Sequence, residues 1–262
     1  MNKHGDFIWY ELMTTDADAA SRFYQDVFDW RVSPSGQPGM DYRLITASAG
    51  QVGGILALDA DMLGEGAHPA WLGYLAVDDV DACAASVEQA GGRIVVPPSD
   101  IPDVGRFAMV TDPQGAPFYI MRGAVDEASN AFAAEQPLIG HCAWNELSTT
   151  DPDAAKAFYG AQFGWVKDGE LDMGDHGHGA YEFLRHGFMF GAVMPKMPEQ
   201  PVSGWTFYFR VADIDRAVEA VKAGGGQVLN GPMQIPGYEF TVNAMDPQGA
   251  AFAFVGPRAT EG

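Results

Sequence analysis

The chain has 262 residues, of which 47% are hydrophobic, and its 15 basic and 35 acidic residues give a formal net charge of −20. A surface this acidic repels nucleic-acid phosphates and anionic lipid, so neither is expected as a partner. No apolar run approaches the roughly 20 residues that span a bilayer, and the N-terminus lacks an apolar signal-peptide core. We therefore expect a cytoplasmic protein, whose two cysteines are buried thiols rather than a disulfide.

The start of the chain, as far as Leu58, predicts a strand, a helix and then several further strands. Residues 7–12 alternate between two faces, as a strand does. Thr15 with Asp18 at the third position after it resembles a capping box, and apolar residues then recur at helical spacing as far as Trp30. The short apolar segments 42–46 and 53–58, with Gly and Pro between them, are typical of strands.

Residues 70–121 predict the same order of elements. A strand at 72–77 precedes a helix at 80–90, which ends at a Gly-Gly pair, a common C-terminal stop. Strands at 93–96, 107–111 and 117–121 follow, and an Asp-Pro-Gln-Gly turn joins the last two. Each of the two segments is therefore interpreted as a βαβββ module.

The second half of the chain repeats the first almost without gaps. The segment that begins at Trp9 reads Trp-Tyr-Glu-Leu, and the one at Trp144 reads Trp-Asn-Glu-Leu, a shift in numbering of 144 − 9 = 135. The turn Asp-Pro-Gln-Gly begins at Asp112 and again at Asp246, a shift of 246 − 112 = 134. A duplication of this size predicts four βαβββ modules and an α+β fold.

We expect these modules to form two domains of two modules each. The predicted domains are residues 1–122 and 139–262, joined by a polar, Ala-rich linker at 123–138. A chain of this length favours two domains of ordinary size.

The four modules, the Asp-Ala-Asp-Ala-Ala-x-x-Phe-Tyr helix and the paired Asp-Pro-Gln-Gly turns resemble the vicinal oxygen chelate superfamily. That superfamily includes glyoxalase I, extradiol dioxygenases, fosfomycin-modifying enzymes and bleomycin-resistance proteins, and the resemblance covers nearly the whole chain. It is closest to the single-chain, four-module, glyoxalase-like branch. The resemblance implies paired modules that curl into half-open barrels around a pocket, and, in many members, a divalent metal held by His and Glu. One fold hosts many functions, so the reaction does not follow from it.

The positions that correspond to metal ligands in that superfamily carry no ordinary ligand here. They are Trp9, Leu72 and Tyr119 in the first half and Trp144, Thr206 and Ala253 in the second. Most of these side chains do not bind divalent metals in the usual way, and Thr binds them poorly. We therefore expect no metal and no other cofactor. The residues expected to bind a ligand are Trp9, Leu72, Tyr119, Trp144 and Thr206.

Two glutamates are the candidate catalytic residues. Because strand side chains alternate, Glu11 faces the same side as Trp9, and Glu146 the same side as Trp144. A carboxylate beside an indole is partly desolvated, which suits acid–base chemistry or the binding of a cationic ligand. The alternative is that each glutamate pairs internally and that each tryptophan fills the space of a lost metal.

The histidines give weaker signals. Glu182 and His186, at positions i and i+4 of a predicted strand, are a candidate metal pair in the second half. His176 and His178 lie in a Gly-rich stretch and are interpreted as a solvated hairpin tip.

Two functions from different classes fit these observations. The first is a metal-free protein that binds a small apolar or aromatic metabolite or antibiotic, as bleomycin-resistance proteins do. The second is a lyase or isomerase of the glyoxalase type, either a metal-free acid–base catalyst using Glu11 or Glu146 or an enzyme with relocated metal ligands. In either case the partner is a small molecule, and the protein is a monomer or a homodimer.

Overall fold

The computed structural model describes residues 2–133, 135, 137–173, 179–198 and 200–259. The first module comprises β1 Phe7–Thr14, α1 Ala17–Phe28, β2 Arg31–Pro34, β3 Tyr42–Ala47 and β4 Gly50–Ala57, followed by the short helix α2 Ala60–Gly64. The second comprises β5 Ala70–Ala76, α3 Val80–Gln89, β6 Arg93–Ile101, β7 Gly105–Thr111 and β8 Pro117–Gly123. The third comprises β9 Cys142–Thr149, α4 Pro152–Phe163, β10 Val166–Asp172, β11 Ala180–His186 and β12 Phe188–Pro195. The fourth comprises β13 Gly204–Arg210, α5 Ile214–Ala223, β14 Gln227–Ile235, β15 Glu239–Met245 and β16 Ala251–Gly256.

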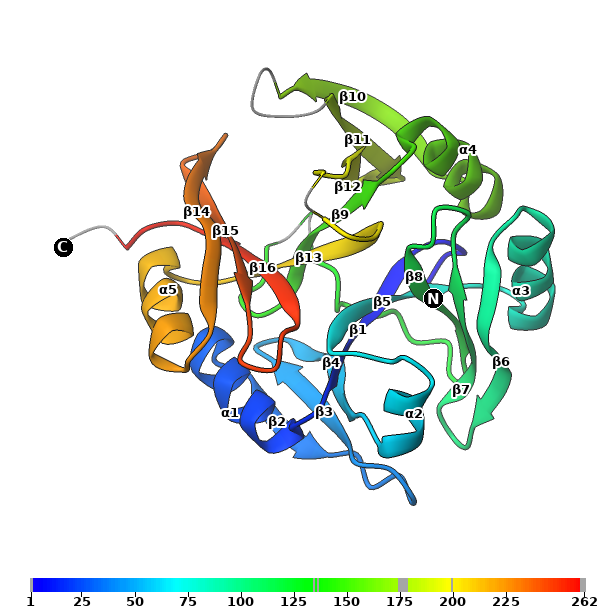
Figure 1. Cartoon of the computed structure of the whole chain (residues 1–262), viewed down its shortest axis with the longest axis horizontal. Coiled ribbons are helices and arrows are strands. Elements are labelled where there is room, and N and C mark those ends of the chain that lie inside the picture. Colours follow the sequence, from blue (N-terminus) through cyan, green and yellow to red (C-terminus); the bar gives the residue numbers. More distant parts are fainter. Residues whose placement is uncertain (1, 134, 136, 174–178, 199, 260–262) are drawn as a thin grey trace. The chain divides into compact units, whose positions relative to one another are not determined.

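The strands form two eight-stranded sheets (Figure 1). Their strand orders are β2-β3-β4-β1-β5-β8-β7-β6 and β10-β11-β12-β9-β13-β16-β15-β14, so the second sheet repeats the first. The predicted α+β class and the four βαβββ modules are thereby confirmed. No helix of the described residues is long and apolar enough to cross a membrane.

Residue contacts divide the chain in a different way from the sheets. One compact unit contains residues 1–8, 73–129 and 145–206, and the other contains 9–72, 130–144 and 207–262. The first unit therefore combines the second and third modules, and the second unit combines the first and fourth. Among the described residues between β8 and β9 there is no helix or strand, only a bridge between Phe132 and Cys142. The domain boundaries at residues 122 and 139 stay a prediction.

Each repeated helix begins at an aspartate. The Asp16 carboxylate accepts a hydrogen bond from the Ala19 N–H at 2.9 Å, and Asp151 accepts one from Ala154 at 3.0 Å. Such a cap satisfies one of the backbone donors that the first turn of a helix leaves open. The helix start predicted at Thr15 is therefore slightly early, because the adjacent Asp16 is the N-cap.

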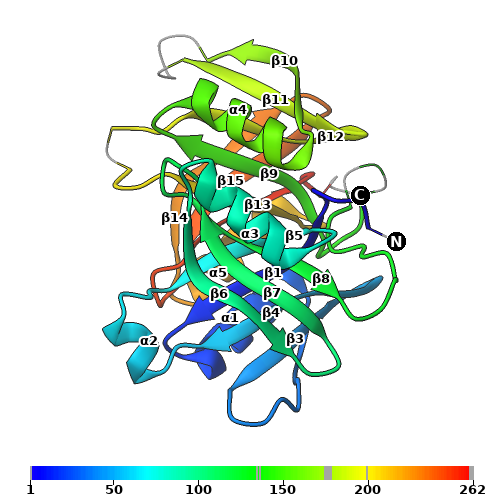
Figure 2. The ribbon, with the colours of Figure 1, turned by 90° about the vertical axis from the view of Figure 1, so that its right-hand side faces the viewer.

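In the first unit, α3 lies against β6, β7 and β8, and α4 lies against β10 and β12 (Figure 2). The Asp-Pro-Gln-Gly turn reaches the α4 layer through Asp112. Its Oδ1 accepts the N–H groups of Gln114 and Ala116, both at 2.9 Å, and its Oδ2 accepts the Tyr159 hydroxyl at 3.2 Å. The Trp205 indole donates to the same hydroxyl at 3.2 Å. Burial raises the pKa of Asp112 above the ordinary aspartate value.

The second unit repeats this arrangement, with α1 and α5 side by side (Figure 1). Tyr24 donates to Asp246 Oδ2 at 3.0 Å, and the Trp71 indole donates to the Tyr24 hydroxyl at 2.9 Å. All three side chains are buried. In both units, therefore, the buried hydroxyl of a helix tyrosine donates a hydrogen bond to a turn aspartate of another module.

Candidate functional site

Strand β1 separates two sets of side chains. Tyr10 and Leu12 are fully buried on the face that packs into the core, and Trp9 and Glu11 lie on the opposite face. We call the sheet face that carries Trp9 and Glu11, and in the second sheet Trp144 and Glu146, the site face.

Glu11 lies beside a tyrosine on the site face. The Trp9 indole donates to the Tyr42 hydroxyl at 2.9 Å, and Tyr42 is in turn hydrogen-bonded to Glu11. Burial, and then the negative charge of Glu11, raise the Tyr42 pKa well above its ordinary value. Glu11 itself is 3% exposed. The group is therefore a hydrogen-bonded series of indole, phenol and carboxylate, in which the tyrosine keeps its proton.

Gly54 makes room for this series. It pairs with Glu11 across β4 and β1, and a Cβ added there would overlap the Tyr42 hydroxyl. Directly opposite residues of neighbouring strands share a face, so the tyrosine ring reaches Glu11 over a position that has no side chain.

The second sheet repeats the carboxylate and its tyrosine. Tyr181 on β11 donates to Glu146 Oε2 at 2.8 Å, and Glu146 is 9% exposed. Ala192 on β12 stands opposite Glu146, where Gly54 stands opposite Glu11. Each half of the chain thus places a glutamate of its first strand against a tyrosine of its third.

The two tryptophans have different surroundings. Trp9 donates to Tyr42, whereas Trp144 packs against a cluster of Tyr208, Ala253 and Val255. Both indoles are half-buried. That they line ligand cavities together with the glutamates stays a prediction.

The remaining predicted ligand-binding residues are mostly enclosed. Tyr119 is 5% exposed because its ring stacks on that of Tyr74, with centroids 4.2 Å apart. Leu72 is also buried, and Thr206 is half-buried. Stacked aromatic rings give the β5–β8 module an apolar site face.

The positions expected to hold the superfamily's metal carry side chains that are not ordinary metal ligands. The Trp9 indole is a hydrogen-bond donor, Tyr119 is stacked on another ring, and Ala253 offers no ligand atom. In the part of the chain that the structure describes, no three His, Cys, Asp or Glu side chains lie together as metal ligands would.

The metal pair predicted at Glu182 and His186 is wrong. Glu182 accepts hydrogen bonds from Lys156 and Lys167, and His186 Nε2 lies 3.5 Å from Asp6. Although burial alone would raise it, the two lysines hold the pKa of Glu182 below its ordinary value. His176 and His178 lie outside the described residues.

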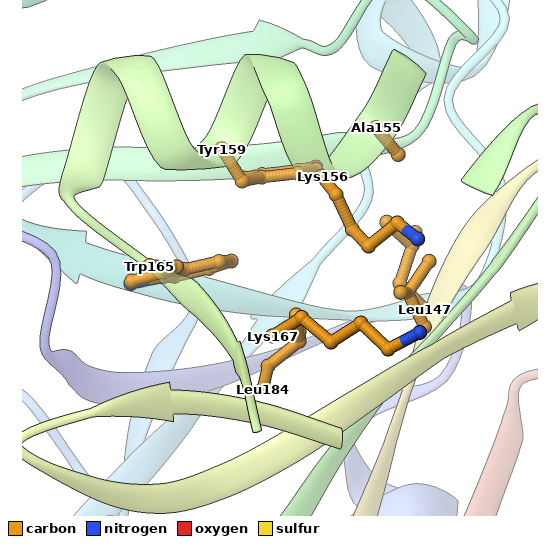
Figure 3. Close-up of a pocket in the computed structure, with 8 residues that line it drawn as sticks. Leu147, Ala155, Lys156, Tyr159, Trp165, Lys167 and Leu184 are labelled. Atoms are coloured by element: carbon orange, nitrogen blue, oxygen red, sulfur yellow. The ribbon is translucent and has the colours of Figure 1, made fainter. Parts of the chain in front are cut away.

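A cavity of about 30 Å³ lies under α4 (Figure 3). It is lined by Leu147, Ala155, Lys156, Tyr159, Trp165, Lys167, Leu184 and Val193. This volume suits a water molecule, not a metabolite. Leu147 follows Glu146 in β9 and points to the other face of the sheet, so the cavity is separate from the site face.

The sequence reasoning missed Tyr42 and Tyr181. Both stand near the start of the third strand of their module, but the shift in numbering between them is 181 − 42 = 139 instead of 135. The longer connection before β11 hides their equivalence from a constant-offset comparison. A comparison that allowed a short insertion at this point would have matched them.

Comparison with known proteins gives consistent results. Residues 7–120 and 138–254 each match the family model described as the Glyoxalase/Bleomycin resistance protein/Dioxygenase superfamily. The protein named "Putative glyoxylase CFP32" of Mycobacterium tuberculosis is 35% identical over 254 residues, which cover 95% of this chain and 94% of that protein. The "Anthracycline biosynthesis protein DnrV" of Streptomyces peucetius is 30% identical over 267 residues, covering 94% and 91%.

Solved structures share the fold. The Mn(II)-bound glyoxalase from Novosphingobium aromaticivorans superposes with a TM-score of 0.62 at 19% identity, covering 99% of this chain and 84% of that one. An extradiol ring-cleaving dioxygenase from B. fuscum gives a TM-score of 0.66 at 15% identity, covering 98% and 73%.

Proposed function

Because the chain belongs to the glyoxalase/bleomycin resistance protein/dioxygenase superfamily, we propose that it binds a small aromatic or apolar molecule on its site faces without a metal. The observation that carries the proposal is the repeated glutamate–tyrosine pair, at Glu11 with Tyr42 and at Glu146 with Tyr181, on the face where the superfamily holds its metal. The half-buried indoles of Trp9 and Trp144 belong to the same strands as the two glutamates, and small-molecule sites typically combine aromatic side chains with a few polar groups.

The polar pairs have a clear role in this proposal. An ionised carboxylate has about four acceptor sites, so one that accepts a tyrosine hydrogen bond can accept another from a donor on the ligand. Indole and phenol rings offer flat faces to a planar ligand, each stacked pair adding about 0.5–1.5 kcal/mol beyond the buried area. The relatives named for anthracycline biosynthesis support a fused-ring ligand, so an anthracycline is a suitable first probe.

The test is calorimetric titration of an anthracycline into wild type, Glu11→Gln, Glu146→Gln and the double variant. Glutamine still accepts the tyrosine hydrogen bond, so we expect melting temperatures close to wild type. Loss of the charge should weaken binding about tenfold, the effect of one charge-assisted hydrogen bond.

The matched control is Glu182→Gln, since Glu182 lies on the opposite face of the second sheet and holds two lysines. It should lower stability and leave binding unchanged. If the Glu11 and Glu146 variants lose stability and none loses binding at low temperature, the glutamates are scaffolding.

A second candidate is acid–base catalysis of the glyoxalase type. It is favoured by the Tyr181 hydroxyl at 2.8 Å from Glu146, which joins a proton donor to a potential base, and by the relative that carries the name glyoxylase. The test is conversion of the methylglyoxal–glutathione hemithioacetal to its thioester, with and without a chelator. Turnover that survives chelation and disappears in Glu11→Gln or Glu146→Gln would establish this candidate over simple binding.

A further inference from the structure

The fourth module carries charged and polar side chains on its site face. On β13, Phe207 and Phe209 point into the core, and Tyr208 and Arg210 point to the other side. Arg210 donates to both carboxylate oxygens of Glu239, with Nη2 at 3.0 Å from Oε2. The Arg210 side chain is 13% exposed and that of Glu239 27%. The ion pair is thus mostly desolvated, and Glu239 keeps the larger exposed part.

Two more polar groups adjoin the ion pair. Tyr208 stands opposite Ala253 on β16, and Asn243 on β15 stands on the other side of Ala253, so the three share one face. The Tyr208 hydroxyl lies 3.5 Å from Asn243 Oδ1 across the small alanine. Arg210 is the next side chain along the same face, since Phe209 between it and Tyr208 points into the core.

The scaffold does not require these polar groups. The equivalent positions of the second module, found by the same shift in numbering as the turns, hold Ala76 for Arg210, Gly105 for Glu239 and Met109 for Asn243. In that module Tyr119 fills the alanine position and stacks on Tyr74. The same fold therefore forms with an apolar face in one half and a polar face in the other.

The ion pair also leaves one donor unused. Arg210 Nε is buried and has no hydrogen-bond acceptor among the described residues. A buried N–H without an acceptor destabilises the protein, and an oxygen brought against it by a ligand would remove that cost. Glu239 already neutralises the guanidinium, so a neutral oxygen fits better than a second carboxylate.

We propose that Arg210, Glu239, Tyr208 and Asn243 form a polar subsite that binds a neutral ligand through a carbonyl with a neighbouring hydroxyl. Arg210 Nε donates to the carbonyl oxygen, and Glu239 accepts from the hydroxyl. The apolar ring system of the ligand lies on the aromatic side chains. This inference rests on the proposed binding function and specifies the ligand's chemistry.

The test compares two probes that differ only in oxygen: a naphthyl α-hydroxyketone and the oxygen-free ethylnaphthalene. We expect wild type to bind the hydroxyketone at least about tenfold more tightly than ethylnaphthalene. Arg210→Lys keeps a positive charge beside Glu239 but lacks the Nε donor, so it should reduce this preference and leave ethylnaphthalene affinity unchanged. The double variant Arg210→Ala/Glu239→Gly, which copies the second module, removes both contacts and should abolish the preference.

The control is Arg216→Ala, which breaks an exposed ion pair with Asp29 in the same unit and should change neither affinity. A preference that persists in Arg210→Lys and in the double variant, or equal affinities in wild type, would overturn the subsite while leaving the binding function intact. If wild type binds neither probe nor an anthracycline, the proposed function fails and the subsite with it. Melting curves show whether each variant folds. If the double variant melts far below wild type while Arg210→Lys still prefers the hydroxyketone as strongly as wild type does, the Arg210–Glu239 ion pair has a structural role instead of a binding role.

Discussion

At the scale of single residues, alternation along β1 and β9 was enough to predict which side chains share a face. Glu11 and Trp9, and Glu146 and Trp144, were paired in this way from the sequence. Their hydrogen-bond partners were not, because Tyr42 and Tyr181 arrive from the third strand of each module through connections of unequal length. The different packing of Trp144 depends on Ala253, which lies far away in the sequence, and a local pattern cannot show it.

Gly54→Ala tests whether the absence of a side chain at residue 54 is needed for Tyr42 to reach Glu11. The added methyl overlaps the tyrosine hydroxyl and should displace the ring from Glu11, lowering the free energy of unfolding by about 1–3 kcal/mol. Urea unfolding measures the loss. Gly64→Ala is the control, because nothing lies within 4 Å of the Cβ it adds. Equal effects of the two substitutions would show that Tyr42 adjusts without cost.

Val193→Ile tests the cavity under α4. The equivalent residue of the first half is the fully buried Ile55, so the extra methylene fits the fold and should fill space beside Leu184. We expect a gain of about 0.5–1 kcal/mol in unfolding free energy. The reciprocal Ile55→Val should lose a similar amount. A lower free energy of unfolding in Val193→Ile would mean that Lys156 and Lys167 hold a water molecule in this cavity and that the added methyl displaces it.

At the scale of elements, the helices, the strands and the Asp-Pro-Gln-Gly turns were predictable, since glycine stops, apolar periodicity and turn residues act locally. The ends of the strands were less predictable. Strand β6 extends to Ile101, beyond the predicted end at Val96. The turns do more than reverse the chain. Asp112 and Asp246 each bind a helix tyrosine of a module distant in sequence, and this contact exists only once the modules have packed.

Tyr159→Phe removes the hydroxyl between Asp112 and Trp205. Both partners are buried and would lose a hydrogen bond, so we expect the unfolding free energy to fall by about 1–3 kcal/mol. Tyr24→Phe should behave alike in the other unit. The control is Tyr238→Phe, because Tyr238 is 85% exposed. Thermal or urea unfolding measures the free energy of unfolding. A value for Tyr159→Phe within roughly 0.5 kcal/mol of wild type is the effect of an ordinary surface substitution and would contradict a structural role for this hydroxyl.

The raised pKa of Asp112 predicts a pH dependence. The folded state binds this proton more tightly than the unfolded chain, so the contribution to stability is complete below about pH 3.9, the ordinary aspartate pKa, and is lost as the pH rises through the folded pKa. The destabilisation caused by Asp112→Asn should therefore be larger in acid than at neutral pH. Urea unfolding of both proteins across that range measures it, and a difference that grows with pH would contradict the assignment.

At the scale of the whole molecule, the duplication predicted that the second half repeats the βαβββ modules of the first, and the strand order of the second sheet does repeat that of the first. Equivalence of the backbone did not carry over to the site faces, where the second module is apolar and the fourth is polar. Packing of the core does not fix the side chains of the site face, so only the scaffold was predictable from the repeat.

The side chains at the positions expected to hold the superfamily's metal predict a metal-free protein. Elemental analysis after dialysis should find far less than one transition metal per chain, because the ligand positions hold Trp9, Trp144 and other side chains unsuited to metal. A stoichiometric metal that resists brief chelation would contradict this and would direct attention to ligands outside the described residues.

Each sheet joins two modules of the same half, whereas each compact unit combines modules of different halves, so the two halves depend on each other. The same tyrosine-to-aspartate bond forms twice, each time between a module of one half and a module of the other. A chain with only the first two modules would lack Asp246, the partner of Tyr24, and Tyr159, the partner of Asp112. A second copy of that chain would have to supply them. In this chain both bonds form within one polypeptide, and the covalent connection gives the two halves an effective concentration of about the millimolar level typical of short linkers.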